Sequence, residues 1–403
     1  MTTATSAQIL RSTRFVLVSD TNGHRPLLPK GDVLCHARGL SKSGDIDELR
    51  QTLRWIDEAD FEVKIIIAGT QDITLDKAFF QKLNRDGRHR RKYAKQDPDQ
   101  CFFLVRDYSS NIKYLHHDGT TIQLRSPTGP RTTFKVFGSP CVPKHNVNDC
   151  AFGYERESYL AECLWSHIPL DTDILLTHTP AYNHHDASTE WQAAGYEMLR
   201  KALWQVRPRL AVCGRIREAR GIEKVQWQLG QDPPFWEKQT TQFDDPDTKA
   251  NKWSALDMTS RGVNPLLSDG APGQQLQQNH VSFSSEREQS EDTLFGTFDD
   301  NGDVPPSEAL TTLSGSSNMT AQTGVTQQDV AGVIHRLEAS QTESPRTQLC
   351  DRNREALWGR LGRQETLIVN ASIQPKAQYP QSRPMLRTPI VVDIELPVGD
   401  KFA

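Results

Sequence analysis

Short runs of apolar and β-branched residues alternate with polar loops and amphipathic stretches along the first part of the chain. Residues 15–18 (FVLV) lead into the polar loop SDTNG, and residues 63–69 (VKIIIAG) lead into the loop TQD. A third apolar run, within residues 30–40, also ends in a loop. Such runs are typical of strands that are buried on both faces of a sheet.

An amphipathic stretch lies between two of these strands. Over residues 45–60 the apolar positions are three or four residues apart, so they share one face that can pack against a sheet. These positions are Ile46, Leu49, Leu53 and Ile56. A strand, a helix and a strand in succession predict a parallel pair joined by a right-handed crossover.

Later apolar runs predict further elements and an α/β fold. Strands are expected over residues 112–115, 121–124, 134–138, 173–178, 210–214, 222–227, 365–371 and 389–396. Turn residues such as Asp118-Gly119 and the segment 127–130 separate the first three of them, which is typical of hairpins. Helices are expected over residues 155–167 and 190–206, and Pro208 marks the end of the second.

The composition changes near residue 230. From there to about residue 352, Gln, Ser, Thr, Asp, Gly and Pro dominate, and the few hydrophobic residues have no steady period. Such a segment buries too little apolar surface to offset its ordering entropy, so we expect a disordered insertion, with a short helix over 329–337 as the alternative. The predicted organisation is a flexible N-terminus (1–13), one domain made of residues 14–230 and 353–403, and an insertion (231–352) inside that domain.

Composition and charge exclude little beyond this. With 403 residues, 36% of them hydrophobic, the chain can bury a sizeable core. Its 47 basic and 51 acidic residues give a net charge of -4, which favours neither nucleic acid nor a membrane surface as a partner. The basic segment 85–95 is either a solvated face or a phosphate-binding or nucleic-acid-binding segment.

The lack of recognisable targeting signals and the spacing of the cysteines predict a soluble, cytoplasmic protein. The N-terminus lacks the apolar core of a secretory signal, and no apolar run reaches the about 18 residues of a membrane span. The seven cysteines are scattered without CxxC spacing, so we expect reduced thiols rather than disulfides or a structural zinc site.

Polar residues at the ends of the strands are the candidate site. Asp20 and Asn22 follow the first strand, and Arg38 and Gly39 follow the second. The other loops carry residues 70–72, His178 and residues 214–217. In open α/β sheets, ligands bind beyond the carboxyl ends of the strands. The alternative for any one loop is an ordinary polar turn.

The order of these segments carries a resemblance to a family. SDTNG, HARGL, AGTQD, LLTHTP and VCGRIREARG together resemble the calcineurin-like metallophosphoesterases, and in particular the metallophosphoesterase domain-containing proteins and their fungal relatives. The resemblance covers about residues 14–230 and 360–396. It implies a calcineurin-like sandwich of two mixed β-sheets flanked by α-helices.

The resemblance also implies a phosphoesterase site with two divalent metals such as Mn, Fe or Zn, which hold a hydroxide and the phosphoryl oxygens. In active members the five loops supply Asp-x-His, Gly-Asp, Gly-Asn-His-Asp, a lone His and Gly-His-x-His. Only Asp20 and His178 match the metal ligands of this pattern. The other positions hold residues that depart from it, and these are Asn22, Gly39, Thr70, Gln71, Arg215 and Arg217.

These departures predict a degenerate site. A glycine has no donor atom, and a guanidinium carries only hydrogen-bond donors and stays protonated. Gln71 replaces the histidine that would protonate the leaving group, and Arg38 lies beside the lost bridging aspartate. We therefore expect no resident cofactor and a pseudoenzyme that acts as a binding or regulatory module, with a phosphate-bearing small ligand or an unknown protein as its partner.

Four alternatives remain open at this point. Arg38, Arg215 and Arg217 bind an anion in place of the metals, or they have drifted and pair with Asp20, Glu218 or Asp72. A residual hydrolase would hold one metal on Asp20, Asn22 and His178. A different reaction would use His178 as a general base with the arginines as oxyanion partners.

Other polar residues near these loops have weaker claims. His36, Asp45, Asp47 and Asp72 are the candidates for replacement metal ligands. His184, His185 and Asp186, in the segment AYNHHD, form either the rim of a substrate site or a new metal site.

Overall fold

A computed structural model gives the fold of most of the chain. It describes residues 8–85, 96–144, 150–156, 159–188, 194–229, 236–245, 255–267, 352–353, 355–357, 362–374 and 386–399. The described residues belong to one compact unit, Met1–Pro272 with Gln327–Ala403. Nearly all of the basic segment 85–95 and the helix expected over 329–337 lie outside the described residues.

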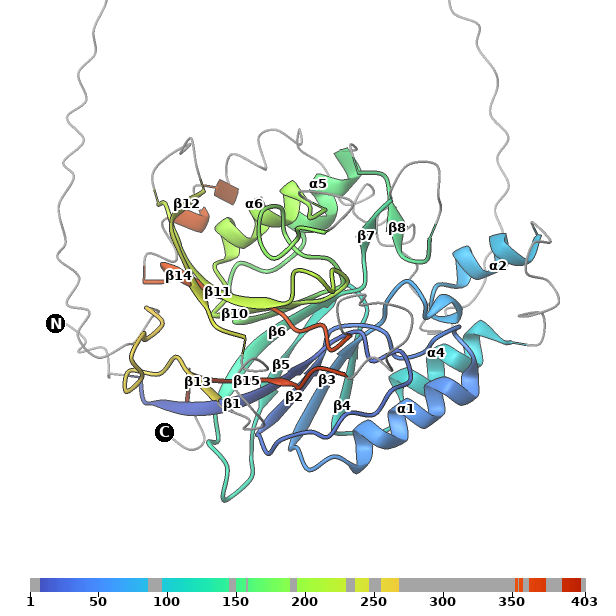
Figure 1. Ribbon diagram of the computed structural model, residues 1–403, viewed down its shortest axis with the longest axis horizontal. Coiled ribbons are helices and arrows are strands. Elements are labelled where there is room, and N and C mark those ends of the chain that lie inside the picture. The colour runs from blue at the N-terminus through green and yellow to red at the C-terminus, as the bar shows by residue number, and fades with distance from the viewer. Residues whose placement is uncertain are drawn as a thin grey trace, which may run out of the picture. The chain divides into compact units, whose positions relative to one another are not determined.

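Two mixed sheets form the centre of this unit, which confirms the predicted α/β sandwich (Figure 1). The first sheet has the order β13 (Ala255–Asp257), β15 (Ile390–Pro397), β1 (Leu10–Val18), β2 (Val33–His36), β3 (Val63–Ile67) and β4 (Ile112–Leu115). The second has the order β12 (Glu237–Phe243), β11 (Gly221–Trp227), β14 (Glu365–Asn370), β10 (Leu210–Cys213), β9 (Ile174–Thr177), β6 (Thr133–Ser139) and β5 (Asp118–Gln123). A small pair is formed by β7 (Val142–Pro143) and β8 (Gly153–Tyr154).

The alternation of side chains along β1 shows how the sheets are covered. Phe15 and Leu17 belong to a core that also contains residues of the second sheet, such as Phe134 and Val212. The residues between and after them, such as Val16, belong to the core on the helical side. Because successive side chains point to opposite faces, a strand covered on both faces must be apolar throughout.

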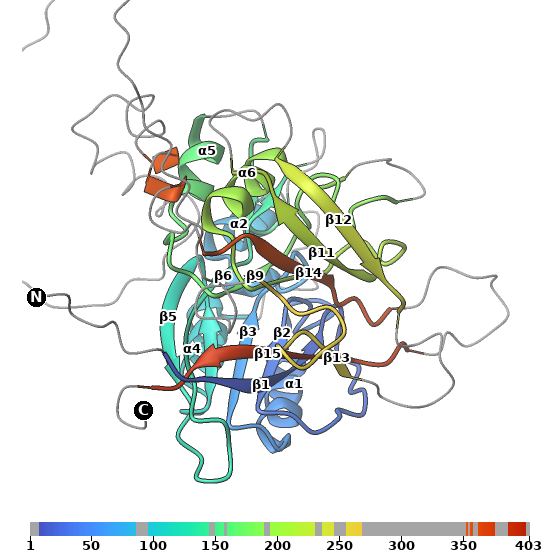
Figure 2. The ribbon, with the colours of Figure 1, turned by 90° about the vertical axis from the view of Figure 1, so that its left-hand side faces the viewer.

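Helices cover the outer faces of both sheets (Figure 2). Next to the first sheet lie α1 (Ile46–Glu58), α2 (Lys77–Arg85), α4 (Pro98–Arg106) and the short 3₁₀ helix η1 (Ile73–Leu75), and next to the second lie α5 (Tyr159–Ser166) and α6 (Glu197–Val206). In α1 the predicted face is confirmed, since Leu49, Leu53 and Ile56 are buried. Asp45 begins this helix by accepting hydrogen bonds from the N–H groups of Asp47 and Glu48.

The structure differs from the expected helices in two places. Helix α4 was not predicted, although Asp97 and Pro98 at its start are the capping residue and first-turn proline that could have revealed it. Helix α6 begins at Glu197, with Tyr196 as its N-cap, not at the predicted residue 190. Residues 189–193 lie outside the described part of the chain.

The prediction of hairpins from residue 112 onwards is confirmed for one pair of strands and wrong for the other. Only β5 and β6 form an antiparallel pair, and Asp118 and Gly119, predicted to form a turn, lie inside β5. Strand β4 instead pairs in parallel with β3 in the first sheet. The chain therefore changes sheets near His117, whose φ of 59° is left-handed. Local alternation cannot tell which sheet a strand joins.

The expected disordered insertion does contain strands. Strand β12 pairs with β11, and β13 pairs in parallel with β15. The low apolar content of these segments hid them, because their partners are provided by strands far away in sequence. Most of the rest of residues 231–352 lies outside the described residues, and its predicted disorder stays a prediction.

The loops of the candidate site meet at one edge of the two sheets. Strands β1, β2 and β3 are parallel to one another, as are β9 and β10, so their carboxyl ends lie on the same side. Ser19 forms an isolated bridge with Ser372 of the segment after β14, which connects the two sheets at this edge. None of the helices in the described ranges is long and apolar enough to cross a membrane.

Candidate functional site

Asp20 lies at the centre of the loops, directly after β1. It is 2% exposed, and its φ of 59° turns the chain sharply at this point. Its Oδ1 atom is 2.9 Å from Nη1 of Arg38. Its Oδ2 atom accepts hydrogen bonds from the backbone N–H of Arg215 at 3.0 Å and from the Ser19 hydroxyl at 3.2 Å. Both carboxylate oxygens are therefore used by the protein.

Arg38 follows β2 and forms a buried ion pair with Asp20. Arg38 is 6% exposed, and its carbonyl accepts a hydrogen bond from the Asp20 N–H at 3.1 Å. Its Nε atom is buried and has no hydrogen-bond partner among the described residues. A Cβ at Gly69 would lie 3.0 Å from Cβ of Arg38, so the glycine makes room for this side chain.

Gly39 and Asn22 are packed against each other. Gly39 has a φ of 76°, and a Cβ built on it would lie 2.6 Å from Oδ1 of Asn22. That oxygen is buried and lacks a hydrogen-bond partner among the described residues. A side chain at position 39 would thus require both a left-handed backbone and a displaced Asn22.

His178 is fully buried beyond the end of β9. Burial lowers its pKa well below the usual value, and the positive charges of Arg38 and Arg215 lower it further. The backbone of Ala68 acts in the opposite direction, yet neither ring nitrogen makes a hydrogen bond of ordinary geometry to the described residues. The imidazole is therefore neutral at neutral pH, with one donor and one acceptor nitrogen.

Arg215 lies beyond β10, held in a left-handed conformation with φ 73°. Burial lowers its pKa, and so does the charge of Arg38. Its Nη1 atom is buried and has no hydrogen-bond partner among the described residues. A guanidinium that is desolvated and only partly paired is costly unless a ligand or water satisfies it.

Arg156 is a cation that sequence reasoning missed. Its charge contributes to the lowered pKa of Arg215, and its guanidinium donates to the carbonyl of Gly195 at 2.8 Å. It lies after β8, a two-residue strand without an apolar run, so no sequence pattern placed it here. Arg217, in contrast, is exposed, and no described contact joins its side chain to this cluster.

Asp72 has a structural role, not a binding one. It is fully buried and accepts hydrogen bonds from the N–H groups of Gly69, Leu40 and Ser41 and from the Ser41 hydroxyl. Burial raises its pKa, and these bonds offset part of that shift. It joins the loops after β2 and β3, while Thr70 and Gln71 beside it are partly exposed.

The other candidate replacement ligands are also used elsewhere. Nε2 of His36 is 2.8 Å from the Thr21 hydroxyl, and burial lowers the pKa of this histidine to about 4. Asp45 caps helix α1, and Asp47 is an exposed partner of Arg50.

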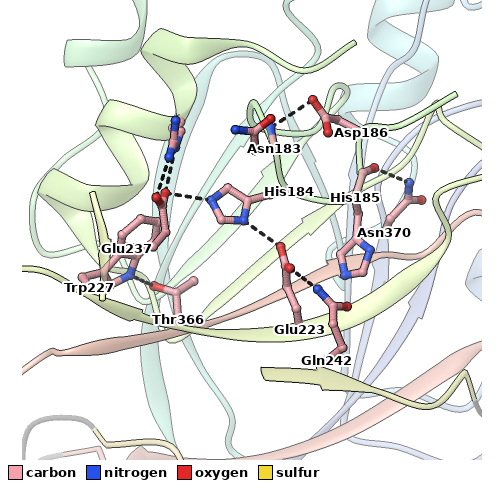
Figure 3. A network of polar contacts seen from close by, with 11 residues as sticks. Asn183, His184, His185, Asp186, Glu223, Trp227, Glu237, Gln242, Thr366 and Asn370 are labelled. Atoms are coloured by element: carbon pink, nitrogen blue, oxygen red, sulfur yellow. Dashed lines mark hydrogen bonds and ion pairs between the residues drawn. The ribbon is translucent and has the colours of Figure 1, made fainter. Parts of the chain in front are cut away.

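His184 is buried in a network of charges and is not at a substrate rim (Figure 3). Nδ1 lies 2.7 Å from Glu223, and Nε2 lies 3.1 Å from Glu237. Burial alone would lower the pKa of His184, but its bonds to the two carboxylates raise the pKa to about 9. Arg200 and Gln242 complete the network by donating to Glu237 and Glu223.

The neighbours of His184 stabilise the same loop. Asp186 accepts hydrogen bonds from the N–H groups of Asn183 and Gly195 at 3.0 and 2.9 Å. A Cβ at Gly221 would lie 2.5 Å from the ring of His185. His185 and Asp186 line an open cavity of about 580 Å³, and their place at the rim of a substrate site stays a prediction.

Comparisons with known proteins show which proteins this chain is similar to. Metallophosphoesterase domain-containing protein 1 of Homo sapiens is 32% identical over 215 residues, which are 52% of this chain and 62% of that protein. A UPF0046 protein of Caenorhabditis elegans is 30% identical over 219 residues, 52% of each chain. Over about half of its length, this chain is similar to metallophosphoesterase domain-containing protein 1 and to the UPF0046 proteins.

Two further findings limit the conclusions that this similarity supports. The probable rhamnogalacturonate lyase C of Emericella nidulans is 36% identical over 220 residues, 54% of this chain but 18% of that protein. The chain thus spans less than two thirds of the length of each of these relatives. No protein-family model matches the chain.

The metals expected of a metallophosphoesterase do not fit the residues present. Both oxygens of Asp20 already have protein partners, and two guanidinium groups act on His178. Like charges a few ångströms apart repel by several kcal/mol at intermediate dielectric, so these cations disfavour a dication in the same space. Among the described residues, no group of three or more His, Cys, Asp or Glu could hold a metal ion.

Proposed function

We propose that this metallophosphoesterase homologue is a binding module for a phosphate-bearing ligand, which it does not hydrolyse. The observation that carries the proposal is a set of buried donors that have no hydrogen-bond partner among the residues described by the structure. They are Nε of Arg38, Nη1 of Arg215 and one ring nitrogen of His178. Guanidinium groups recognise phosphate through charge-assisted hydrogen bonds.

The alternative of drift would leave the arginines paired within the protein. Arg38 agrees with this alternative in part, because its Nη1 atom forms an ion pair with Asp20. Arg215 does not, since only its backbone N–H contacts Asp20 and its buried Nη1 has no partner among the described residues. A buried donor without a partner costs free energy, and an anion that accepts hydrogen bonds from both arginines would remove this cost.

Titration of the purified protein with inorganic phosphate and with adenosine monophosphate tests the proposal. We expect binding with a dissociation constant below about 1 mM. Arg215→Met should weaken it at least about tenfold, which corresponds to one lost charge-assisted hydrogen bond. Arg217→Met, which changes an exposed arginine two residues away, is the matched control and should bind as the parent does. No heat with either anion at millimolar concentration would refute the pocket.

Metal content and turnover separate the binding module from the residual hydrolase on Asp20, Asn22 and His178. We expect less than stoichiometric Mn, Fe or Zn in the purified protein. With added Mn²⁺, hydrolysis of bis-p-nitrophenyl phosphate should not exceed that of Asp20→Ala. Stoichiometric metal together with turnover that Asp20→Ala abolishes would establish the hydrolase instead.

A further inference from the structure

The candidate site contains unpaired acceptors as well as unpaired donors. His178 is neutral, so only one of its two ring nitrogens can carry a hydrogen, and the other is an acceptor. Neither nitrogen makes a hydrogen bond of ordinary geometry within the described part of the chain. Oδ1 of Asn22 is a second buried acceptor without a partner among the described residues. An anion that only accepts hydrogen bonds would satisfy the arginines and leave these two atoms unpaired.

We infer that the candidate site selects an oxyanion that carries a hydroxyl, such as hydrogen phosphate, over a fully deprotonated oxyanion of the same size, such as sulfate. The inference rests on the proposed function and adds the chemical form of the ligand. The P–O⁻ oxygens accept from Arg38 and Arg215, and the P–OH group donates to His178 or Asn22. A buried acceptor left without a donor costs about 1–3 kcal/mol, which corresponds to about tenfold to hundredfold in affinity.

Hydrogen bonds and an ion pair connect the loops that carry these groups. Asp20 contacts both arginines, by an ion pair to Arg38 and a backbone bond to Arg215. Both arginines act electrostatically on His178. The backbone N–H of Asn22 donates to the carbonyl of Gly39 at 2.8 Å, directly after Arg38.

Phosphate and sulfate are the matched probes, because they have the same shape and differ in the hydroxyl. Near neutral pH inorganic phosphate carries at least one P–OH, whereas sulfate carries no hydrogen. Isothermal titration at about pH 6.5 should give phosphate at least tenfold tighter binding than sulfate. A third titration with adenosine monophosphate tells whether the ligand is free phosphate or a phosphate ester.

Asn22→Gly tests the acceptor itself. Asn22 has a φ of 45°, which glycine adopts without strain, so the variant should keep the fold. It should weaken phosphate binding and leave sulfate binding unchanged, so the ratio of phosphate affinity to sulfate affinity should fall. Thermal unfolding confirms that the variant is folded, and Arg217→Met should keep the parent ratio.

The outcomes separate this inference from the proposal on which it rests. Equal affinity for phosphate and sulfate, or tighter sulfate binding, overturns the inference and leaves the anion pocket standing. An unchanged ratio in Asn22→Gly overturns the part assigned to Asn22. No binding of either anion overturns the proposed function and the inference with it.

Discussion

At the scale of single residues, the candidate site is formed by side chains whose roles depend on their immediate neighbours. Asp20 would be a metal ligand if its oxygens were free, but Arg38, Arg215 and Ser19 occupy them. Gly39, which could be read as a lost ligand, also has a positive φ and a close contact with Asn22. The local backbone therefore favours glycine at position 39.

Gly39→Ala should destabilise the protein. Its positive φ costs a residue with a Cβ about 1–2 kcal/mol, and the close approach to Oδ1 of Asn22 adds to this cost. Urea unfolding measures the effect. The double variant Gly39→Ala with Asn22→Gly removes the close contact and should recover part of the loss. If the single variant is as stable as the parent, the packing of these two residues is not as described.

Arg38→Met should destabilise the protein by about 3–5 kcal/mol, because it leaves the Asp20 carboxylate buried without its counter-charge. Arg38→Met combined with Asp20→Asn should lose less than the sum of the two single variants. A double-mutant cycle by chemical denaturation gives this coupling. Strict additivity would show that the ion pair contributes nothing measurable.

At the scale of elements, the charge network of His184 fastens β12 to the second sheet. Glu237 opens β12, Glu223 lies on β11, and His184 lies in the loop after β9. Burial would raise the pKa of Glu237, but the bonds from Arg200 and His184 lower it to about 2. A segment with little apolar surface is thus held by paired charges that are excluded from water.

This network makes the stability depend on pH. The pKa of His184 is higher in the folded protein, about 9, than its usual value of 6.5. The stability it contributes is therefore complete below about pH 6.5 and is lost as the pH rises towards 9. The difference amounts to about 3 kcal/mol at most.

His184→Gln provides the measurement. Urea unfolding of parent and variant at about pH 6, 7.5 and 9 should show a stability difference that shrinks as the pH rises. Lys201→Gln, which removes a partly exposed ion pair with Glu162 on the neighbouring helix, should give a difference nearly independent of pH in this range. A constant difference for His184→Gln would mean that the histidine is not charged in the folded protein.

At the scale of the whole molecule, residues Met1–Pro272 and Gln327–Ala403 form a unit separate from Gly273–Thr326. A short Gly/Ser linker in place of residues 273–326 should therefore leave the unfolding temperature within about 2 °C of the parent. Extending the deletion to residue 255 removes β13 and exposes the edge of β15, which should lower the unfolding temperature and promote aggregation. A large loss of stability in the shorter deletion would contradict the prediction.

The sequence by itself determined most of the sandwich. Strands β3 and β10 and the second half of β1 were predictable because both of their faces are covered, which favours a nearly unbroken apolar run. The prediction of a flexible N-terminus over residues 1–13 was wrong for residues 10–13, which are polar or partly exposed but pair with β15. The face of α1 followed from its periodicity. The positions of Asp20 and His178 followed from the strands that they end and from the resemblance of the loops.

Only the tertiary structure decided which polar groups meet. It assigned β4 and β5 to different sheets, added β12 and β13, and brought the charge of Arg156 near enough to Arg215 to lower its pKa. It also gave His184 a buried partner on β12. Apolar burial can be predicted from a short stretch of sequence, because most buried positions in a strand are apolar whatever lies opposite. The pairing of charges and of edge strands depends on residues far apart in the chain, so no local sequence pattern predicts it.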